Sequence, residues 1–235
     1  ATSSVYFMPI LPKVEFGNYM ADVASHEFLH IITPLNIHSE EIGYFDFQNP
    51  KMSKHLWLYE GATEYNAKYI QLRSGMVTMK DYVEEIDSKI KNSKTRHNDT
   101  LPFTTLSLTC LENQDEYLNV YEKGALINLC LDIELKELSG GAYGLQELIR
   151  DLSLKYGKDQ PFKDDELFDV IVGLTYPEIG TFFTKYVSGN NPLPLKADLA
   201  KIGLDYVENG KKMAYSFGFN KLGFDMSLGK FMIDS

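Results

Sequence analysis

Apolar residues recur every three or four positions along most of the chain, which is the spacing that one face of an α-helix requires. The clearest case is the stretch 79–91, where Tyr82, Val83, Ile86 and Ile90 are at helical spacing. The same pattern predicts helices over the ranges 19–33, 53–75, 79–91, 116–138, 144–156, 164–172, 177–187 and 196–202.

Glycine and proline support several of these boundaries. Asn18 can cap a first helical turn, and Pro34 ends the helix that follows it. Gly140 and Gly141 form a typical C-terminal stop, and Pro177 suits a first turn. The ranges 5–13, 35–51 and 92–100 are expected to be an extended lead-in, a loop and a polar connection.

The pattern changes after about residue 204. Over 211–234, short alternating runs such as 213–217 are separated by single glycines, which favours short strands in a meander. We therefore predict a mainly α fold with a small C-terminal β segment. The expected domains are a helical domain over 1–204 and a β appendage over 205–235.

Composition places the chain among ordinary globular proteins, with 235 residues, 44% hydrophobic residues and 24% charged residues. Its net charge of -10 disfavours binding to nucleic acid, and no apolar run is long enough to span a bilayer. Cys110 and Cys130 are expected to be buried free thiols rather than a disulfide. The chain begins at Ala1 without a Met or a secretory leader, so we expect it to be a fragment or a processed form. The compartment and the oligomeric state stay open.

The sequence His26-Glu27-Phe28-Leu29-His30 is the strongest chemical signal in the chain. Histidines four residues apart lie on one helix face, one turn apart, so both imidazoles can reach one ion. Zinc suits two imidazoles and a carboxylate, with one position left for water. Glu27 is the expected general base, because it can take a proton from that water and pass it to the leaving amine.

Glu60 is the best candidate for the third ligand. It lies on a separate predicted helix after Leu56, Trp57 and Leu58, where an unpaired carboxylate would be unfavourable. We therefore expect one zinc ion per chain, bound by His26, His30 and Glu60.

Two further residues complete the predicted site. Glu64 is one turn beyond Glu60 and could accept the second ring N–H of a ligand histidine, although a solvated helix charge explains it equally well. Tyr121 is the candidate donor to the oxyanion of the reaction, although a helical tyrosine is more often part of a core. His38 and His55 are expected to be structural or rim residues, and His97 to be on the surface.

These segments resemble one known family. In chain order they are the histidine motif, Phe45-Asp46-Phe47, the run from Leu56 to Tyr65, the run from Tyr121 to Leu126, Leu131-Asp132-Ile133, and Ser139-Gly140-Gly141. The set resembles the glycyl aminopeptidase family, PDZ-containing zinc peptidases with a thermolysin-like catalytic domain. The resemblance covers about residues 23–204.

The resemblance implies a thermolysin-like zincin fold and hydrolysis of peptides or proteins that carry a small N-terminal residue such as Gly or Ala. It assigns His26, His30 and Glu60 as zinc ligands and Glu27 as the base. Through the related aminopeptidases, it also implies that Tyr121 stabilises the transition state.

Some family features are missing from the sequence. The N-terminal β domain and the Gly-Gly-Leu-Glu-His-like segment before the metal helix are absent from this chain, and residues 211–235 could be the opening of a PDZ-like module. The residue that binds the substrate amine is therefore expected upstream of Ala1. Three functions follow: a zinc aminopeptidase, a zinc endopeptidase of the same clan, or a catalytically silent interaction module with the same fold.

Overall fold

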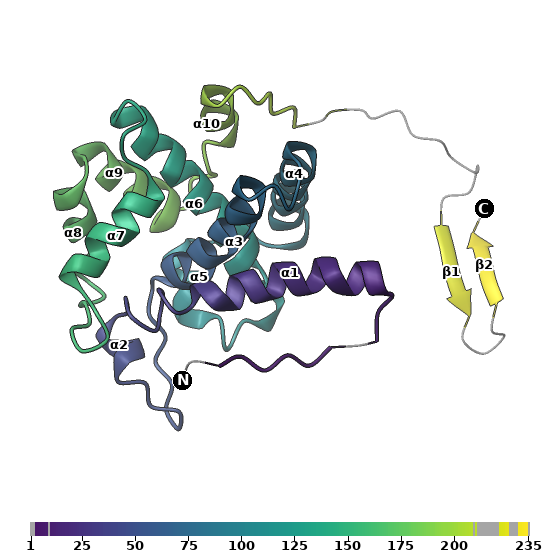
Figure 1. The fold of residues 1–235 in the computed structure, drawn as a ribbon, viewed down its shortest axis with the longest axis horizontal. Coiled ribbons are helices and arrows are strands. Elements are labelled where there is room, and N and C mark those ends of the chain that lie inside the picture. The colour runs from purple at the N-terminus through teal and green to yellow at the C-terminus, as the bar shows by residue number, and fades with distance from the viewer. Residues whose placement is uncertain (1–2, 9, 209, 211–220, 226–229, 235) are drawn as a thin grey trace.

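The computed structural model describes residues 3–8, 10–208, 210, 221–225 and 230–234. It contains a helical body, and a separate two-stranded hairpin lies to one side (Figure 1). The helices of the described residues are α1 (Lys13–Leu29), α2 (Glu40–Gly43), η1 (Trp57–Gly61), α3 (Ala62–Arg73), α4 (Met79–Arg96), α5 (Phe103–Thr109), η2 (Gln114–Glu116), α6 (Asn119–Leu138), α7 (Leu145–Lys155), α8 (Leu167–Leu174), α9 (Pro177–Phe182), η3 (Phe183–Val187) and α10 (Leu195–Lys201).

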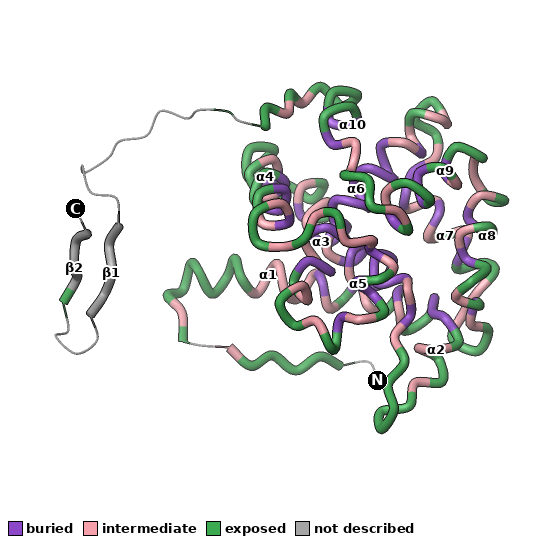
Figure 2. The backbone as a smooth tube through the Cα atoms, turned by 180° about the vertical axis from the view of Figure 1, so that it is seen from behind, coloured by how far each residue is buried: buried purple, intermediate pink, exposed green. Residues whose placement is uncertain are grey.

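Helix α6 is the centre of the body. Nearly every residue from Asn119 to Leu135 is buried, including the polar Lys123, Asn128 and Asp132, so the helix is enclosed on nearly all sides. It packs against η1, α3 and α4, and also against α5, α7, α9 and α10 (Figure 2). The core therefore surrounds one helix, and α1 lies on its outside, packed against α3.

Helix α4 forms for a reason that is visible in the sequence. Thr78 and Asp81 make reciprocal bonds at its start, a capping box that satisfies two free amides. Tyr82, Ile86 and Ile90 are its buried apolar face, as the spacing predicted. The helix extends to Arg96 rather than ending at 91, because the buried face continues through Ser93.

The predicted bounds of the histidine helix were wrong at both ends. Helix α1 begins at Lys13 and contains Gly17, and it ends at Leu29 rather than at Thr33. Residues 30–36 form an irregular turn in which the amide of Leu35 donates to the carbonyl of His30. A residue before proline avoids the α conformation, which is consistent with regular helix ending ahead of Pro34.

The predicted helix over 53–75 is two elements. Its first part is the π-helical turn η1, which carries Glu60, and the α-helix α3 follows at Ala62. The predicted helix over 116–138 begins only at Asn119. The short helix α5 was missed because its buried apolar residues, Phe103 and Leu106, cover less than two turns. The prediction of a mainly α fold is confirmed by the element content.

Near the C-terminus, β1 (Lys221–Asp225) and β2 (Lys230–Asp234) pair antiparallel, with Lys221 opposite Asp234. The run 213–217 on which the predicted meander partly rested lies outside the described residues. The boundary between domains at about residue 204 therefore stays a prediction. Among the described residues, no helix has the length and apolarity that crossing a membrane requires.

Candidate metal centre

Three side chains from two elements converge on one point. Nε2 of His26 lies 3.2 Å from Oε2 of Glu60, and Nε2 of His30 lies 3.5 Å from the same oxygen. The histidines project from the end of α1, and the π-helical turn η1 brings the glutamate to them. Turns of this kind occur often at functional sites, because one extra residue per turn redirects a side chain.

The far side of each imidazole is already bonded. Nδ1 of His30 donates to the backbone carbonyl of Thr33 at 2.9 Å, and a carbonyl can only accept. Nδ1 of His26 donates to Oε2 of Glu64 at 2.8 Å. In the neutral rings, both Nε2 atoms therefore carry lone pairs that point toward the carboxylate of Glu60. Such a group of acceptors is stable only around a proton or a cation.

The spacing of these atoms fits a metal ion. Zinc bonds to nitrogen and oxygen of about 2.0–2.1 Å place the ligand atoms of a tetrahedron about 3.3 Å apart. The separations of 3.2 and 3.5 Å agree with that edge. The donor set of two imidazoles and one carboxylate is also the one that zinc accepts in catalytic sites.

The pKa values of these side chains also indicate that the cluster favours a bound positive charge. Burial lowers the pKa of His26, but hydrogen bonds to Glu60 and Glu64 outweigh it and raise that pKa to about 9. Burial raises the pKa of Glu60, but the bonds to His26 and His30 overcome this and lower it to about 2. Without an ion, the cluster therefore holds a proton on the imidazole of His26 at neutral pH.

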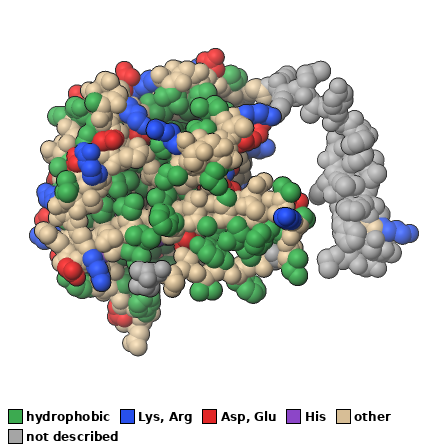
Figure 3. All heavy atoms as spheres, viewed as in Figure 1, with side chains coloured by type: hydrophobic (Ala, Val, Ile, Leu, Met, Phe, Trp, Pro, Cys, Tyr) green, Lys and Arg blue, Asp and Glu red, His purple; other side chains and the backbone are tan. Residues whose placement is uncertain are grey.

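Glu27 forms a group of possible ligands with the same two histidines. A ligand atom from each of His26, Glu27 and His30 can be chosen so that all three lie within 4.8 Å of one another. Glu27 also lines a groove with His30 and Glu60, which the N-terminal segment borders through Ser3, Ser4 and Tyr6. Hydrophobic side chains gather on the face that carries α1 (Figure 3), and the exposed Phe28 and Leu35 line the same groove.

Tyr121 comes from the central helix and lies beside the cluster. Its ring centroid is 5.8 Å from that of His26, and its hydroxyl is 3.3 Å from the hydroxyl of Tyr117. Burial raises the pKa of Tyr121, and the negative charge of Glu60 raises it further. The phenol therefore stays protonated at neutral pH and is a hydrogen-bond donor.

A close approach of two backbones fixes the distance between these elements. Gly61 directly follows Glu60 and lies against Gly124 of α6, three residues after Tyr121. A Cβ on Gly61 would be 2.6 Å from the carbonyl carbon and oxygen of Gly124. The close partner of Gly61 is therefore α6 rather than the helix that carries the histidines.

Lys89 is a feature of the site that sequence analysis missed. It lies on α4, is only 8% exposed, and its Nζ is 2.7 Å from Oε1 of Glu64. One signal could have found it. Lys89 is seven residues after Tyr82, and hence on the buried face of its helix, where a lysine needs a partner.

The other histidines lie outside the cluster. His55 is fully buried, accepts from Nε1 of Trp57 and donates to the carbonyl of Asp164, and burial lowers its pKa to about 4. His38 is also buried and donates to the carbonyl of Pro34, so both histidines are structural as expected. His97 was expected on the surface, but its side chain is only 7% exposed, because it packs against Asp115 and Glu116.

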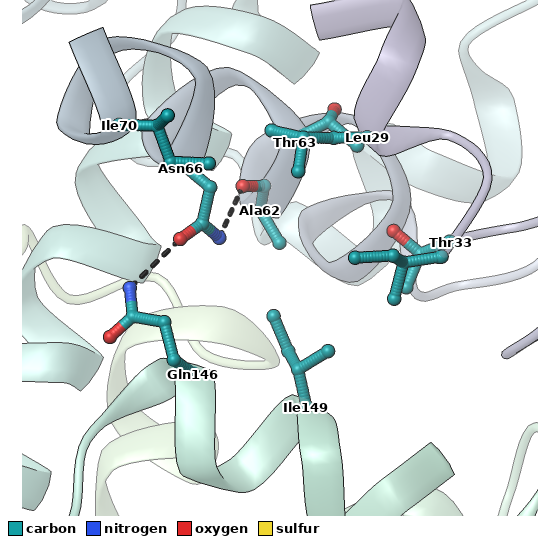
Figure 4. Close-up of a pocket in the computed structure, with 9 residues that line it drawn as sticks. Leu29, Thr33, Ala62, Thr63, Asn66, Ile70, Gln146 and Ile149 are labelled. Carbon is teal, nitrogen blue, oxygen red and sulfur yellow. Dashed lines mark hydrogen bonds between the residues drawn. The ribbon is translucent and has the colours of Figure 1, made fainter. Parts of the chain in front are cut away.

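A second pocket lies between α1, α3 and α7 (Figure 4). Leu29, Ile70 and Ile149 make it mostly apolar, and the amides of Asn66 and Gln146 hydrogen-bond across it. None of the three convergent side chains lines this pocket, so the groove beside Glu27 is the better candidate for a substrate. Cys110 and Cys130 are buried free thiols, as predicted.

Comparison with known proteins agrees with the resemblance. Residues 19–127 match the M61 glycyl aminopeptidase family, and this range contains the candidate metal ligands as well as Glu27, Glu64, Lys89 and Tyr121. No curated protein matches the chain significantly. Among solved structures, an aminopeptidase N family protein from Idiomarina loihiensis superposes over 83% of this chain, with a TM-score of 0.71 and 20% sequence identity.

That superposition establishes the fold. The chain spans only 35% of the length of the Idiomarina protein, so it corresponds to one part of a larger relative. The helical body thus has the fold of one part of that aminopeptidase N family protein. Over residues 19–127, the chain is similar to the M61 glycyl aminopeptidase family.

Proposed function

We propose that this chain is the catalytic part of a zinc-dependent peptidase, most specifically an aminopeptidase that removes small N-terminal residues such as Gly or Ala. The observation that carries the proposal is the convergence of two imidazole nitrogens and one carboxylate oxygen, each histidine having its other nitrogen already bonded. The name of the matched family supports the small N-terminal residue.

The metal would be held by His26, His30 and Glu60. A zinc ion bound there supplies Lewis-acid chemistry, which polarises a water molecule and the scissile carbonyl. Glu64 holds the Nδ1 proton of His26, and the Thr33 carbonyl holds that of His30, so both rings keep their lone pairs on Nε2.

The remaining roles belong to Glu27 and Tyr121. Glu27 takes the proton of the attacking water and later delivers it to the leaving amine, which requires a carboxylate beside both. Tyr121 donates its phenolic hydrogen to the oxyanion that forms as the carbonyl carbon becomes tetrahedral. A substrate would lie in the groove lined by Glu27, Phe28 and Leu35.

The first test is metal content. The chain purified without chelator should contain about one zinc per molecule, and a His26→Ala/His30→Ala double variant should contain almost none. A wild-type chain with no affinity for zinc would rule out the proposed function.

The second test separates exopeptidase from endopeptidase activity. A glycyl peptide with a free N-terminus and the same peptide with an acetylated N-terminus are assayed side by side. An aminopeptidase should cleave only the first. Equal cleavage of both would leave a zinc endopeptidase of the same clan as the function.

A further inference from the structure

Lys89 is a buried lysine enclosed by three carboxylates. Its Nζ lies 2.7 Å from Oε1 of Glu64, 3.3 Å from Oε1 of Glu85 and 3.6 Å from Oε2 of Glu122. Burying an ammonium group without partners is strongly unfavourable, so these contacts are what keep the side chain inside. Its position makes Lys89 a junction of α3, α4 and α6.

Glu64 connects this lysine to the metal cluster. One carboxylate oxygen, Oε1, accepts from Lys89, and the other, Oε2, accepts from Nδ1 of His26 at 2.8 Å. A glutamate side chain has several rotatable bonds, and a hydrogen bond at one oxygen alone leaves it free to turn. Contacts at both oxygens fix the carboxylate and, through it, the plane of the His26 ring.

The same lysine also reaches the tyrosine side of the site. Glu122 follows Tyr121 directly on α6, and its Oε1 accepts from Nδ2 of Asn92, one turn after Lys89 on α4. The lysine thus lies between the helix that carries Glu64 and the helix that carries Tyr121.

We propose that Lys89 is a positioning residue of the metal centre, which holds Glu64 so that Nε2 of His26 faces Glu60 and thereby sets the affinity of the site for zinc. This inference rests on the proposed function, because it needs the cluster to bind a metal. It assigns a role to a residue that touches neither metal nor substrate.

Lys89 affects zinc affinity in two opposite ways. The direction in which the affinity changes when Lys89 is replaced therefore tests the proposal. As a positive charge near the cluster, Lys89 repels a divalent cation, and removing it would tighten binding if the field alone mattered. As a positioning residue, it preorganises a ligand, and removing it weakens binding. Loss of a partner behind a metal ligand weakens affinity about 10- to 100-fold.

The experiment measures the zinc dissociation constant by competition with a chelator at one pH and ionic strength. Lys89→Met keeps an unbranched side chain that is one atom shorter and removes its charge, and it is expected to bind zinc about 10- to 100-fold more weakly. Lys89→Arg keeps a donor toward Glu64 and should recover most of the affinity. Lys80→Met removes an exposed lysine of the same helix and should bind zinc like the wild type.

A double-mutant cycle with Glu64→Gln tests the route. If Lys89 acts through Glu64, Lys89→Met should weaken zinc binding in the wild type but change it little in the Glu64→Gln background. Lys89→Met could fail to fold, because three carboxylates lose their counter-ion. In that case the double variant Lys89→Met/Glu85→Gln, in which one carboxylate is neutral and the repulsion is smaller, takes the place of Lys89→Met in the cycle.

The outcomes are distinct. Zinc binding by Lys89→Met that equals or exceeds that of the wild type overturns the positioning role and leaves the proposed function intact. An equal loss in both backgrounds also overturns it, because Lys89 would then act independently of Glu64. A wild-type chain that binds no zinc removes both proposals together.

Discussion

Oε2 of Glu60 lies 3.2 Å from Nε2 of His26, although 34 residues separate the two in the chain. The contact depends on the π-helical turn at Trp57–Gly61 and on the packing of α1 against α3. Both histidine rings meet the same carboxylate oxygen, so Glu60 is the residue that closes the cluster.

Glu60→Gln should therefore abolish tight zinc binding. The amide keeps the size of the side chain but removes the negative charge that the two imidazoles face. The expected loss of zinc affinity exceeds about 100-fold, which is the largest loss usual when a hydrogen-bond partner of a metal ligand is removed. Chelator competition measures it. Glu84→Gln, an exposed glutamate on α4, is the matched control and should be unchanged. Retention of wild-type affinity by Glu60→Gln would remove Glu60 from the ligand set.

Glu27→Gln should retain zinc and lose hydrolysis. The amide cannot take a proton from water, and general-base catalysis typically contributes about 10²- to 10⁴-fold to the rate. The turnover number on a glycyl peptide and the zinc content are measured on the same preparation. Full activity in this variant would show that another group is the base.

Tyr121→Phe should lower the turnover number by about 10²- to 10³-fold, the usual effect of removing one oxyanion donor. Zinc affinity should not change, because the hydroxyl contacts Tyr117 rather than a ligand. Tyr44→Phe, at a position that is 76% exposed, is the control. A drop in zinc affinity equal to the drop in rate would instead assign Tyr121 to the metal site.

The metal-free chain should be most stable between about pH 4.5 and 6.5. The folded pKa of His26, about 9, is above its unfolded value of 6.5, so its contribution is complete below pH 6.5 and is lost as the pH rises toward 9. The folded pKa values of Glu60 and Glu64, about 2, are below 4.5, so their contributions are lost as the pH falls from 4.5 toward 2.

Thermal unfolding of the chelator-treated chain across this range measures the effect. His26→Gln should flatten the decline between pH 6.5 and 9. An unchanged decline in that variant would assign it to another group. Zinc should also release protons on binding below pH 9, which calorimetry in buffers of different ionisation enthalpy detects.

Gly61→Ala should destabilise the fold by about 1–3 kcal/mol, because its Cβ would meet backbone atoms of Gly124 that have no room to shift. Gly173→Ala is the control, and its expected effect on stability is the opposite. Nothing lies within 4 Å of a Cβ at Gly173 in helix α8, so alanine there should stabilise by about 0.4–1 kcal/mol. Urea denaturation measures both, and a neutral Gly61→Ala would contradict the close backbone contact.

Much of this protein can be predicted from local sequence. The spacing of Tyr82, Ile86 and Ile90 predicts helix α4, since one periodic face is enough to define it. The spacing of His26 and His30 likewise predicts that the two imidazoles share a helix face, because that depends only on helix geometry. Both statements concern residues that lie close together on a single helix.

Tertiary structure decided everything that depends on distant residues. The π-helical turn at Glu60, the close contact of Gly61 with Gly124 and the burial of Lys89 behind Glu64 each join elements that sequence spacing does not relate. A local pattern fixes which way a side chain points on its own helix. Only the packing of whole helices determines which partner it meets and whether its charge lies in water or in the interior.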